Sequence, residues 1–351
     1  MTAPNPNPTP LLRTLSLTQI TLYGIGTILG AGIYVLVGEV ANIAGSHMPL
    51  AFVLAALVVS FSAYSYGHLS RLYPVSAGEP IYVQQAFALK SLSTAVGYAI
   101  VFAGVVSAAT IARGFSGYFA IFFELADALT ISLLIIVLTS IAAWGVKLSV
   151  TVAIITTLLE LLGLAFVIYA GADKLPALFN NADSSLIPDS LIAWQGVGAG
   201  AFLAFYAFIG FEDMVNMAEE VKQPEKNMPR GILLALVTAC LLYFIVTLCA
   251  LAAVPLQELA ASKAPLVLVV EQNTSIPIAL MTSISIVAVV NGALLQIIMA
   301  SRVLYGMGKK RMAPGFLATV HPRRQTPLIA TLLVGTLVLS AALLAPLVTL
   351  A

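Results

Sequence analysis

Charged residues are scarce in this sequence. They occupy 9% of its 351 positions, while hydrophobic residues occupy 60%. A soluble domain carries roughly 25% charged residues, so this chain has too few of them to cover a water-exposed surface. The composition excludes an ordinary soluble protein and predicts an integral membrane protein in contact with lipid.

Cysteine and histidine are almost absent as well. The two cysteines, Cys240 and Cys249, lie in one apolar run, which excludes a disulfide scaffold and a Cys-ligated metal site. The histidines are His47, His68 and His321, which are too scattered to form a metal-ligand cluster. With 16 Lys and Arg against 15 Asp and Glu, the net charge of +1 gives no bulk attraction to nucleic acid. We therefore expect no metal, no cofactor and no nucleic-acid partner.

Long apolar runs are what the sequence has in abundance. A helix needs about 20 apolar residues to cross roughly 30 Å of hydrocarbon. Repeated runs of that length predict helices rather than the short alternating segments of a membrane barrel. We expect an all-α integral membrane protein with about nine transmembrane helices, near residues 17–41, 49–73, 95–123, 128–146, 149–171, 192–217, 231–254, 276–306 and 327–350.

The distribution of basic residues predicts the orientation, because Lys and Arg concentrate in cytoplasmic loops. With a cytoplasmic N-terminus, twelve of the 16 basic residues fall on the cytoplasmic side. Residues 1–16 are polar and rich in proline, so we expect a disordered cytoplasmic tail there. Nine spans then place the C-terminus on the outer side.

The first and sixth predicted helices are both interrupted by glycine. The first reads YGIGTILGAGIYVLVG and the sixth WQGVGAGAFLAFYAFIGFED. Glycine lets a backbone leave helical geometry, and an unwound stretch exposes N–H and C=O groups that lipid cannot satisfy. Close helix packing through Gly26 and Gly30 would explain one such helix. Two of them at matching positions in two halves of a chain favour a transporter binding site.

Several longer motifs carry a resemblance to a known family. They are GTILGAGIYVLVG, SRLYPVSAGEPIYVQQAF, FYAFIGFEDMVNMAEEVKQPEKNMPRGI, NGALLQIIMASRVLYGMGKKRMAP and VHPRRQTP. From Leu17 onward the chain resembles permeases of the amino acid–polyamine–organocation superfamily, nearest to bacterial members that are similar to cationic amino acid transporters. The resemblance implies a leucine-transporter-like fold of two inverted five-helix repeats in a single transport domain. The first repeat would be 17–171, followed by an extracellular loop at 172–191 and a second repeat at 192–351 with four of its five helices.

The same resemblance implies a substrate site at the two interruptions. Backbone N–H groups of Gly30, Ala31 and Gly32 would bind the α-carboxylate of an amino acid. The α-ammonium would lie against carbonyl groups near Thr27, Ile28, Ala207 and Phe208. The resemblance also implies that four residues lie at or beside the substrate: Tyr206, Phe208, Ile209 and Gly210.

Ionisable residues inside the membrane are functional candidates, because a charge there is costly. Glu160 lies in mid-span, where desolvation favours its neutral form. We expect it to bind and release a coupled proton or to bond to the unwound backbone of the first helix. A neutral, hydrogen-bonded structural role is the alternative.

Other polar residues also lie in or near the predicted spans. Arg113 is a candidate for gating or helix packing and would seek a carboxylate. Glu212 is a candidate to face the cytoplasmic vestibule, whereas we expect interfacial solvation for Asp213. Asn291 is expected either to line the cavity or to bond between helices. For Arg302 we expect its side chain to extend to the cytoplasmic interface.

The function that these features favour is secondary active transport of an amino acid or related amine by alternating access. We expect coupling to protons by symport or exchange, in the bacterial inner membrane, with the substrate, the proton and membrane lipid as partners. An amino-acid sensor built on a transporter scaffold, or a channel, remains the alternative. The scattered histidines offer no catalytic constellation, so we expect no enzyme. Nor does the sequence contain a G-x-x-x-x-G-K-[ST] loop for ATP.

Overall fold

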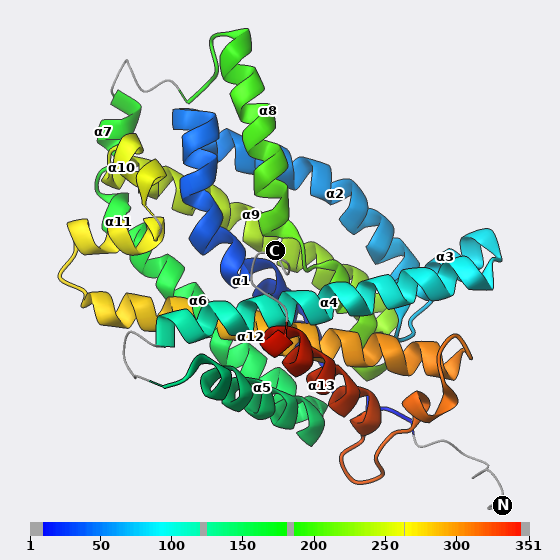
Figure 1. Cartoon of the computed structure of the whole chain (residues 1–351). Helices are drawn as coiled ribbons and strands as arrows, with labels where there is room; N and C mark the ends of the chain where they lie inside the picture. Colours follow the sequence, from blue (N-terminus) through cyan, green and yellow to red (C-terminus); the bar gives the residue numbers. More distant parts are fainter. Residues whose placement is uncertain (1–9, 120–124, 181–185, 263, 345–351) are drawn as a thin grey trace, which may run out of the picture.

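The computed structural model describes residues 10–119, 125–180, 186–262 and 264–344 (Figure 1). In those residues the chain is helical, with one isolated β-bridge and no strand. The α-helices are α1 (Leu17–Ala44), α2 (Met48–Leu72), α3 (Gly78–Phe87), α4 (Lys90–Phe119), α5 (Asp127–Trp144), α6 (Val146–Ala172), α7 (Leu175–Asn180), α8 (Leu191–Phe205), α9 (Pro224–Ala253), α10 (Leu256–Ala261), α11 (Pro265–Asn273), α12 (Ile278–Lys309) and α13 (Leu328–Leu344).

Helices occupy each range that the hydrophobic runs predicted. Seven segments of the described chain are long and apolar enough to cross a membrane, and α13 is a shorter apolar helix. The prediction of an all-helical membrane protein is therefore confirmed. The exact number of transmembrane helices stays a prediction, and residues 345–350 of the last predicted span lie outside the described residues.

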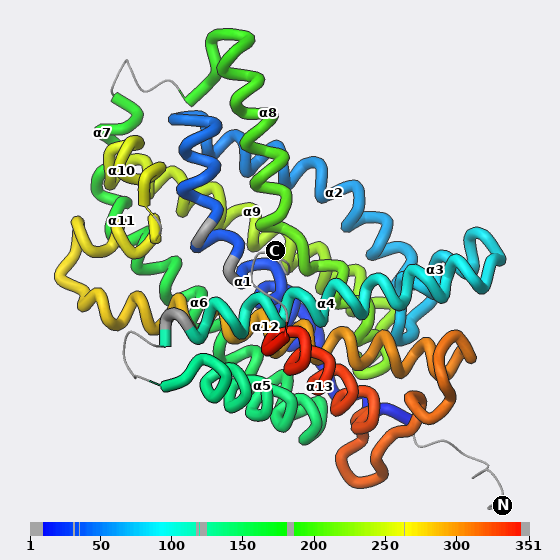
Figure 2. Tube along the Cα trace, in the orientation of Figure 1, coloured from blue at the N-terminus to red at the C-terminus, as the bar shows by residue number. Residues whose placement is uncertain are grey.

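Helix α1 lies at the centre of the molecule. It contacts α6, α8, α9 and α12 (Figure 1). Around it, α2 packs on α8 and α9, while α4 and α5 pack with α12 and α13, as the path of the chain in Figure 2 shows. This arrangement surrounds the interrupted part of α1 with other helices, so its exposed backbone groups meet protein rather than lipid.

The start of α1 is fixed by local sequence. Ser16 and Gln19 form a capping box, in which the Ser16 hydroxyl accepts from the Gln19 N–H and the Gln19 side chain accepts from the Ser16 N–H. This arrangement satisfies two backbone donors that a helix start leaves free. The helix then runs 28 residues to Ala44.

The tail that we predicted to be disordered is partly ordered. Its residues 1–9 lie outside the described residues, but Leu11 and Leu15 are buried. Leu15 forms a parallel bridge with Val221, and the Lys222 N–H donates to the Leu15 carbonyl at 2.8 Å. Residues 10–16 are ordered because apolar side chains and the bridge to Val221 compensate for their polar composition.

Candidate functional site

Helix α1 is interrupted at Gly30. Its backbone has φ 25° and ψ −147°, outside the helical region, and a positive φ favours glycine because there is no Cβ to clash. A Cβ at this position would meet nothing within 4 Å, so the break faces open space. Where a helix resumes, its first N–H groups lack intrahelical acceptors and favour an anion.

The second interruption follows α8. The helix ends at Phe205 and continues as a short 3-10 helix, η2 (Tyr206–Phe208). Ile209 is extended, and Gly210 has φ 127° before a second 3-10 helix, η3 (Glu212–Glu220). The segment therefore leaves α-helical geometry at the position that the glycine pattern predicted.

The two interruptions lie against each other. A Cβ on Gly210 would collide with the carbonyl oxygen of Thr27, and one on Gly32 would lie 3.0 Å from the Cα of Ala207. Thr27 itself keeps a local bond, since its hydroxyl donates to the Gly24 carbonyl at 2.8 Å. Backbone contacts this close require glycine on one side, so the glycines set the distance between the two unwound segments.

Tyr243 of α9 joins both interruptions. Its hydroxyl lies 2.9 Å from the carbonyl oxygen of Ile28 and 2.9 Å from that of Ala207. One hydroxyl hydrogen serves one acceptor at a time, so these two carbonyls share a single donor. Sequence reasoning missed Tyr243, although a tyrosine in an apolar run signals a buried hydroxyl that needs a partner.

The predicted substrate contacts divide into two groups. Tyr206 and Ile209 are exposed and line a cavity of about 540 Å³ together with Gly210. Phe208 instead is fully buried, with its ring centroid 4.9 Å from that of Tyr243. Its ring packs against α9, and its place beside the substrate stays a prediction. The side chain of Ala31 lies outside the described residues.

Three carboxylates line the same cavity. Glu79 of α3, Glu212 and Asp213 of η3 all contribute to its wall, with Tyr66 and Gln296 beside them. Asp213 is 5% exposed and accepts a hydrogen bond of 2.8 Å from the Gln296 amide. The expectation of interfacial solvation for Asp213 was wrong, because α12 and α3 cover η3. The arrangement gathers three carboxyl groups at one cavity.

Glu79 is the carboxylate whose charge is least compensated at this cavity. One oxygen accepts from the Asn216 amide at 3.4 Å, and Oε2 has no hydrogen-bond partner among the described residues. Helix α3 lies outside the candidate membrane spans. The pKa of Glu79 is raised from 4.5 to about 7, mainly by burial and also by the Glu212 carboxylate, while hydrogen bonds to its own backbone and to Asn216 oppose the shift. The carboxyl group is therefore poised to gain or lose a proton near neutral pH.

A second polar cluster surrounds Glu160. The carboxylate is fully buried in α6, and Oε1 accepts a hydrogen bond of 2.9 Å from Asn291 of α12. Oε2 of Glu160 and Oδ1 of Asn291 have no partner in the described part of the chain. Thr157, one turn before Glu160, touches Gly26 of α1 so closely that a Cβ there would collide with its hydroxyl.

This cluster resolves the two expectations for Asn291 and one of those for Glu160. Asn291 bonds between helices, to Glu160 and at 3.4 Å to Thr157. The hydrogen bond recorded for the Glu160 side chain goes to this amide rather than to the unwound backbone of α1. Tyr34 of α1 instead donates to the Glu160 main-chain carbonyl at 2.9 Å.

Arg113 bonds to backbone carbonyls where we expected a carboxylate. Its Nε donates to the carbonyl of Ala342 at 2.5 Å and Nη2 donates to that of Leu343 at 3.3 Å. The last carbonyls of a helix lack intrahelical donors, so Arg113 caps the C-terminal end of α13. Of the two roles expected for Arg113, this contact is one of helix packing, and a role in gating stays a prediction.

Arg302 does not extend to the interface as we expected. It is fully buried and pairs with Glu220, with distances of 3.4 Å from Nε to Oε2 and 3.2 Å from Nη2 to Oε1. Close by, Glu219 pairs with Lys309 at 2.8 Å and accepts from Tyr305 at 3.2 Å. Ion pairs thus hold the end of η3 to α12.

Segment η3 also bonds to the start of α3 and to the loop before it. The N–H of Gly78 donates to the Asn216 side chain at 3.1 Å, and that of Ser76 donates to Glu219 at 3.3 Å. Together with the bridge to Leu15, these bonds connect η3 with the start of α1 and the loop before α3. These contacts join the three segments to one another.

Comparison with known proteins identifies the family of the chain. A sequence model of the amino acid permease family matches residues 15–351. The chain is 29% identical to the vacuolar cationic amino acid transporter 4 of Arabidopsis thaliana, over 97% of this chain and 59% of that protein. It is also 29% identical to the branched-chain amino acid permease BcaP of Bacillus subtilis, over 93% of this chain and 74% of that protein.

A solved structure shares the fold. It is a Na⁺-coupled sialic acid symporter in a substrate-bound, outward-open state, with a TM-score of 0.65 and 14% identity over 94% of this chain and 74% of that one. That protein has the leucine-transporter fold, so the predicted fold class is confirmed. The chain spans 59% of the length of the Arabidopsis relative. On its sequence and its fold, the chain belongs to the amino acid permease family of integral membrane proteins.

Proposed function

We propose that the chain is a secondary transporter that moves an amino acid or related amine across the membrane by alternating access. The observation that carries this proposal is the contact between the two interrupted helices, where Gly32 and Gly210 bring α1 and η2 together. The N–H groups after Gly30 would bind the substrate carboxylate, and the carbonyls of Thr27, Ile28, Ala207 and Phe208 would lie near its ammonium group. Relatives that are named as amino acid permeases support this assignment.

The cavity below the interruptions favours a cationic substrate. By name, the relatives include both a cationic and a branched-chain amino acid transporter, so similarity alone leaves both substrate classes open. Glu79, Glu212 and Asp213 line the cavity without a basic residue in its lining. Charged hydrogen bonds to carboxylates are stronger than neutral ones, so an ammonium or guanidinium group gains most from this wall.

For the coupling ion we propose a proton that Glu160 binds and releases. The bare Oε2 of Glu160 and Oδ1 of Asn291 support this role, because a proton on the carboxyl group supplies the missing donor. Since Thr157 contacts Gly26 of α1, a change in the cluster reaches the interrupted helix. The symporter with the similar fold uses Na⁺, and a sodium gradient is therefore the matched alternative to test.

The membrane orientation follows from the basic residues. We propose a cytoplasmic N-terminus in a bacterial inner membrane, which puts the joined segments of η3, the start of α1 and the loop before α3 on the cytoplasmic side. Most Lys and Arg residues then lie in cytoplasmic loops. The carboxyl groups of the cavity would then lie between these cytoplasmic segments and the two interruptions.

The test is to measure the thermal midpoint of the purified chain with arginine, lysine, leucine and putrescine, followed by uptake into liposomes. A ligand that binds only the folded state raises the midpoint. Gly32→Val should abolish the shift, because its side chain must displace the backbone of Ala207. Gly198→Val is the matched control, since a Cβ there meets nothing within 4 Å.

Two further results separate function from substrate class. Glu79→Gln combined with Asp213→Asn should weaken arginine and lysine binding roughly tenfold or more and leave leucine unchanged, because each lost charged contact is worth about 1.5–3 kcal/mol. Leucine uptake without arginine uptake would contradict the substrate class alone. Binding without uptake would identify a sensor, and uptake that never saturates would identify a channel.

A further inference from the structure

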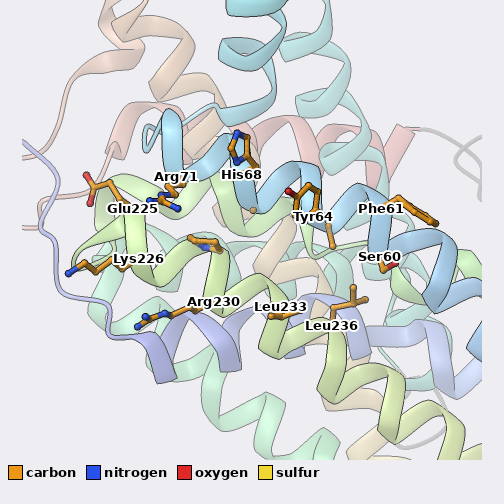
Figure 3. A pocket seen from close by; sticks show the side chains of 13 residues that line it. Ser60, Phe61, Tyr64, His68, Arg71, Glu225, Lys226, Arg230, Leu233 and Leu236 are labelled. Carbon is orange, nitrogen blue, oxygen red and sulfur yellow. The ribbon is translucent and has the colours of Figure 1, made fainter.

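A groove between α2 and α9 carries chemistry that the transport site does not use. It has a volume of about 890 Å³, and its lining comes from the second half of α2 and the first half of α9 (Figure 3). At its floor the two helices pack closely, since a Cβ on Gly67 would lie 3.6 Å from Pro229. Gly67 lets the two helices touch at the floor of the groove, and larger side chains form its walls.

One end of the groove is basic. Figure 3 shows Arg71, Lys226 and Arg230 at this end, near Glu225. Three basic side chains against one acidic side chain leave a local charge of +2. All four are exposed, and the ion pairs recorded among the described residues join η3 to α12 instead. In the described part of the chain, no ion pair joins these basic groups to a carboxylate, and the nearby Glu225 offsets one of their three charges.

The remainder of the groove is apolar and exposed. Phe61, Tyr64 and Leu233 are 71%, 78% and 61% exposed, on a part of the helices that lies within the candidate spans. From Arg71 to Phe61, and equally from Lys226 to Leu236, the helices run ten residues, which is about 15 Å. Half of a roughly 30 Å hydrocarbon core is the same length, so the groove extends across one leaflet.

We propose that this groove binds an anionic glycerophospholipid of the leaflet next to the basic loops, which is the cytoplasmic leaflet in the orientation given above. The lipid phosphate lies at Arg71, Lys226 and Arg230, and an acyl chain follows the groove past Leu233 toward Phe61. Basic pockets between transmembrane helices suit anionic headgroups, and guanidinium groups bind phosphate with paired hydrogen bonds. A zwitterionic lipid brings its own cation into the local charge of +2 and fits less well.

The test is native mass spectrometry of the full chain in detergent, titrated with dioleoylphosphatidylglycerol or with dioleoylphosphatidylethanolamine. We expect the wild type to bind phosphatidylglycerol more tightly. Arg71→Gln with Arg230→Gln should lower that affinity roughly tenfold or more, at about 1 kcal/mol for each basic residue near the headgroups. Lys310→Gln with Arg323→Gln removes the same charge from loops that do not line the groove, and should keep wild-type affinity.

A second variant tests the acyl part without changing charge. Leu233→Trp fills the groove and should also weaken phosphatidylglycerol binding, while its thermal midpoint in lipid-free detergent matches that of the wild type. Equal affinity for the two lipids would overturn the proposal. So would an equal loss in the Lys310 and Arg323 control, or unchanged binding in both groove variants.

Discussion

Two buried glutamates, Glu160 and Glu220, bond to the same helix through partners of different charge. Both have fully buried side chains, and both bond to α12. Glu220 meets the guanidinium of Arg302 at two of its nitrogens, so a full positive charge compensates it. Glu160 meets the neutral amide of Asn291, and its second oxygen has no hydrogen-bond partner within the described ranges. We infer that Glu220 holds the structure together, while Glu160 is left able to bind a mobile ion.

Their positions support the same distinction. Glu220 is the last residue of η3 and lies next to the bridge between Leu15 and Val221, where three segments are joined. Glu160 lies beside the contact of Thr157 with Gly26, four residues before the break in α1. A buried ion pair suits a junction between segments, whereas a carboxyl group with a neutral partner can bind a proton beside the interrupted helix.

The largest expected effect follows from breaking the compensated pair. Arg302→Met should destabilise the protein by about 3–5 kcal/mol, because it leaves Glu220 buried with an unpaired charge. Replacing both partners, as Arg302→Met with Glu220→Leu, should recover most of that loss. Lys309→Met is the control, since its pair with Glu219 has a Lys side chain that is 41% exposed, and exposed pairs contribute about 0–1 kcal/mol. Denaturant unfolding in detergent measures all three, and equal losses for Arg302→Met and Lys309→Met would contradict the distinction.

Glu79 extends the comparison to a carboxylate with partial compensation. Its pKa is about 7 in the folded protein against 4.5 as the ordinary value, so the folded chain holds a proton that the unfolded chain releases. Stability should be greatest below about pH 4.5 and fall as pH rises to about 7, by about 3 kcal/mol. Glu79→Gln should remove this part of the pH dependence, and the exposed Glu271→Gln should leave it in place. Because Glu212, Asp213 and Tyr66 adjoin the group, the difference between variant and wild type is the quantity to compare.

Glu160, whose hydrogen-bond partner is a neutral amide, is tested by measuring transport. One coupled proton gives about tenfold accumulation for each unit of pH difference, since one pH unit corresponds to about 1.4 kcal/mol. Glu160→Gln should abolish this response in liposomes while keeping exchange at equal pH, because the amide cannot take up a proton. Its stability should stay near that of the wild type, unlike that of Arg302→Met. Retained accumulation in the variant would contradict the proton role, and accumulation driven only by a sodium gradient would assign the coupling to Na⁺.

The sequence predicted those parts of the molecule that depend on local pattern. Hydrophobic runs gave the helices, and the glycines at 30 and 210 gave both interruptions, because a positive φ there is a property of the residue itself. The contact between the interruptions followed only as an expectation from the family resemblance. Closeness of Gly32 to Ala207 depends on how α1 and η2 pack, which one sequence does not specify.

Partners of the buried charges were the part that the sequence could not predict. Arg302 lies 82 residues from Glu220, and Arg113 lies 229 residues from the carbonyl it binds. Nothing in the local pattern indicates which distant group will face an isolated cation. We therefore expected the usual behaviour of each residue, extension to the interface for Arg302 and a carboxylate partner for Arg113. The tertiary packing gives both residues other partners.

Tyr243 gives the smallest and most specific prediction, because it serves both interruptions without carrying charge. Tyr243→Phe keeps the ring that packs on Phe208 and removes the hydroxyl that lies 2.9 Å from the carbonyls of Ile28 and Ala207. Losing this hydrogen bond should reduce substrate affinity or stability by about 1 kcal/mol, roughly a fivefold change in binding. Phe52→Leu removes another aromatic contact of Tyr243, with ring centroids 5.6 Å apart, and controls for packing. If Tyr243→Phe lowers stability but leaves affinity untouched, the hydroxyl only fills a structural need. A loss of affinity at unchanged stability would mean that the shared donor sets the spacing of the carbonyls that receive the ammonium group.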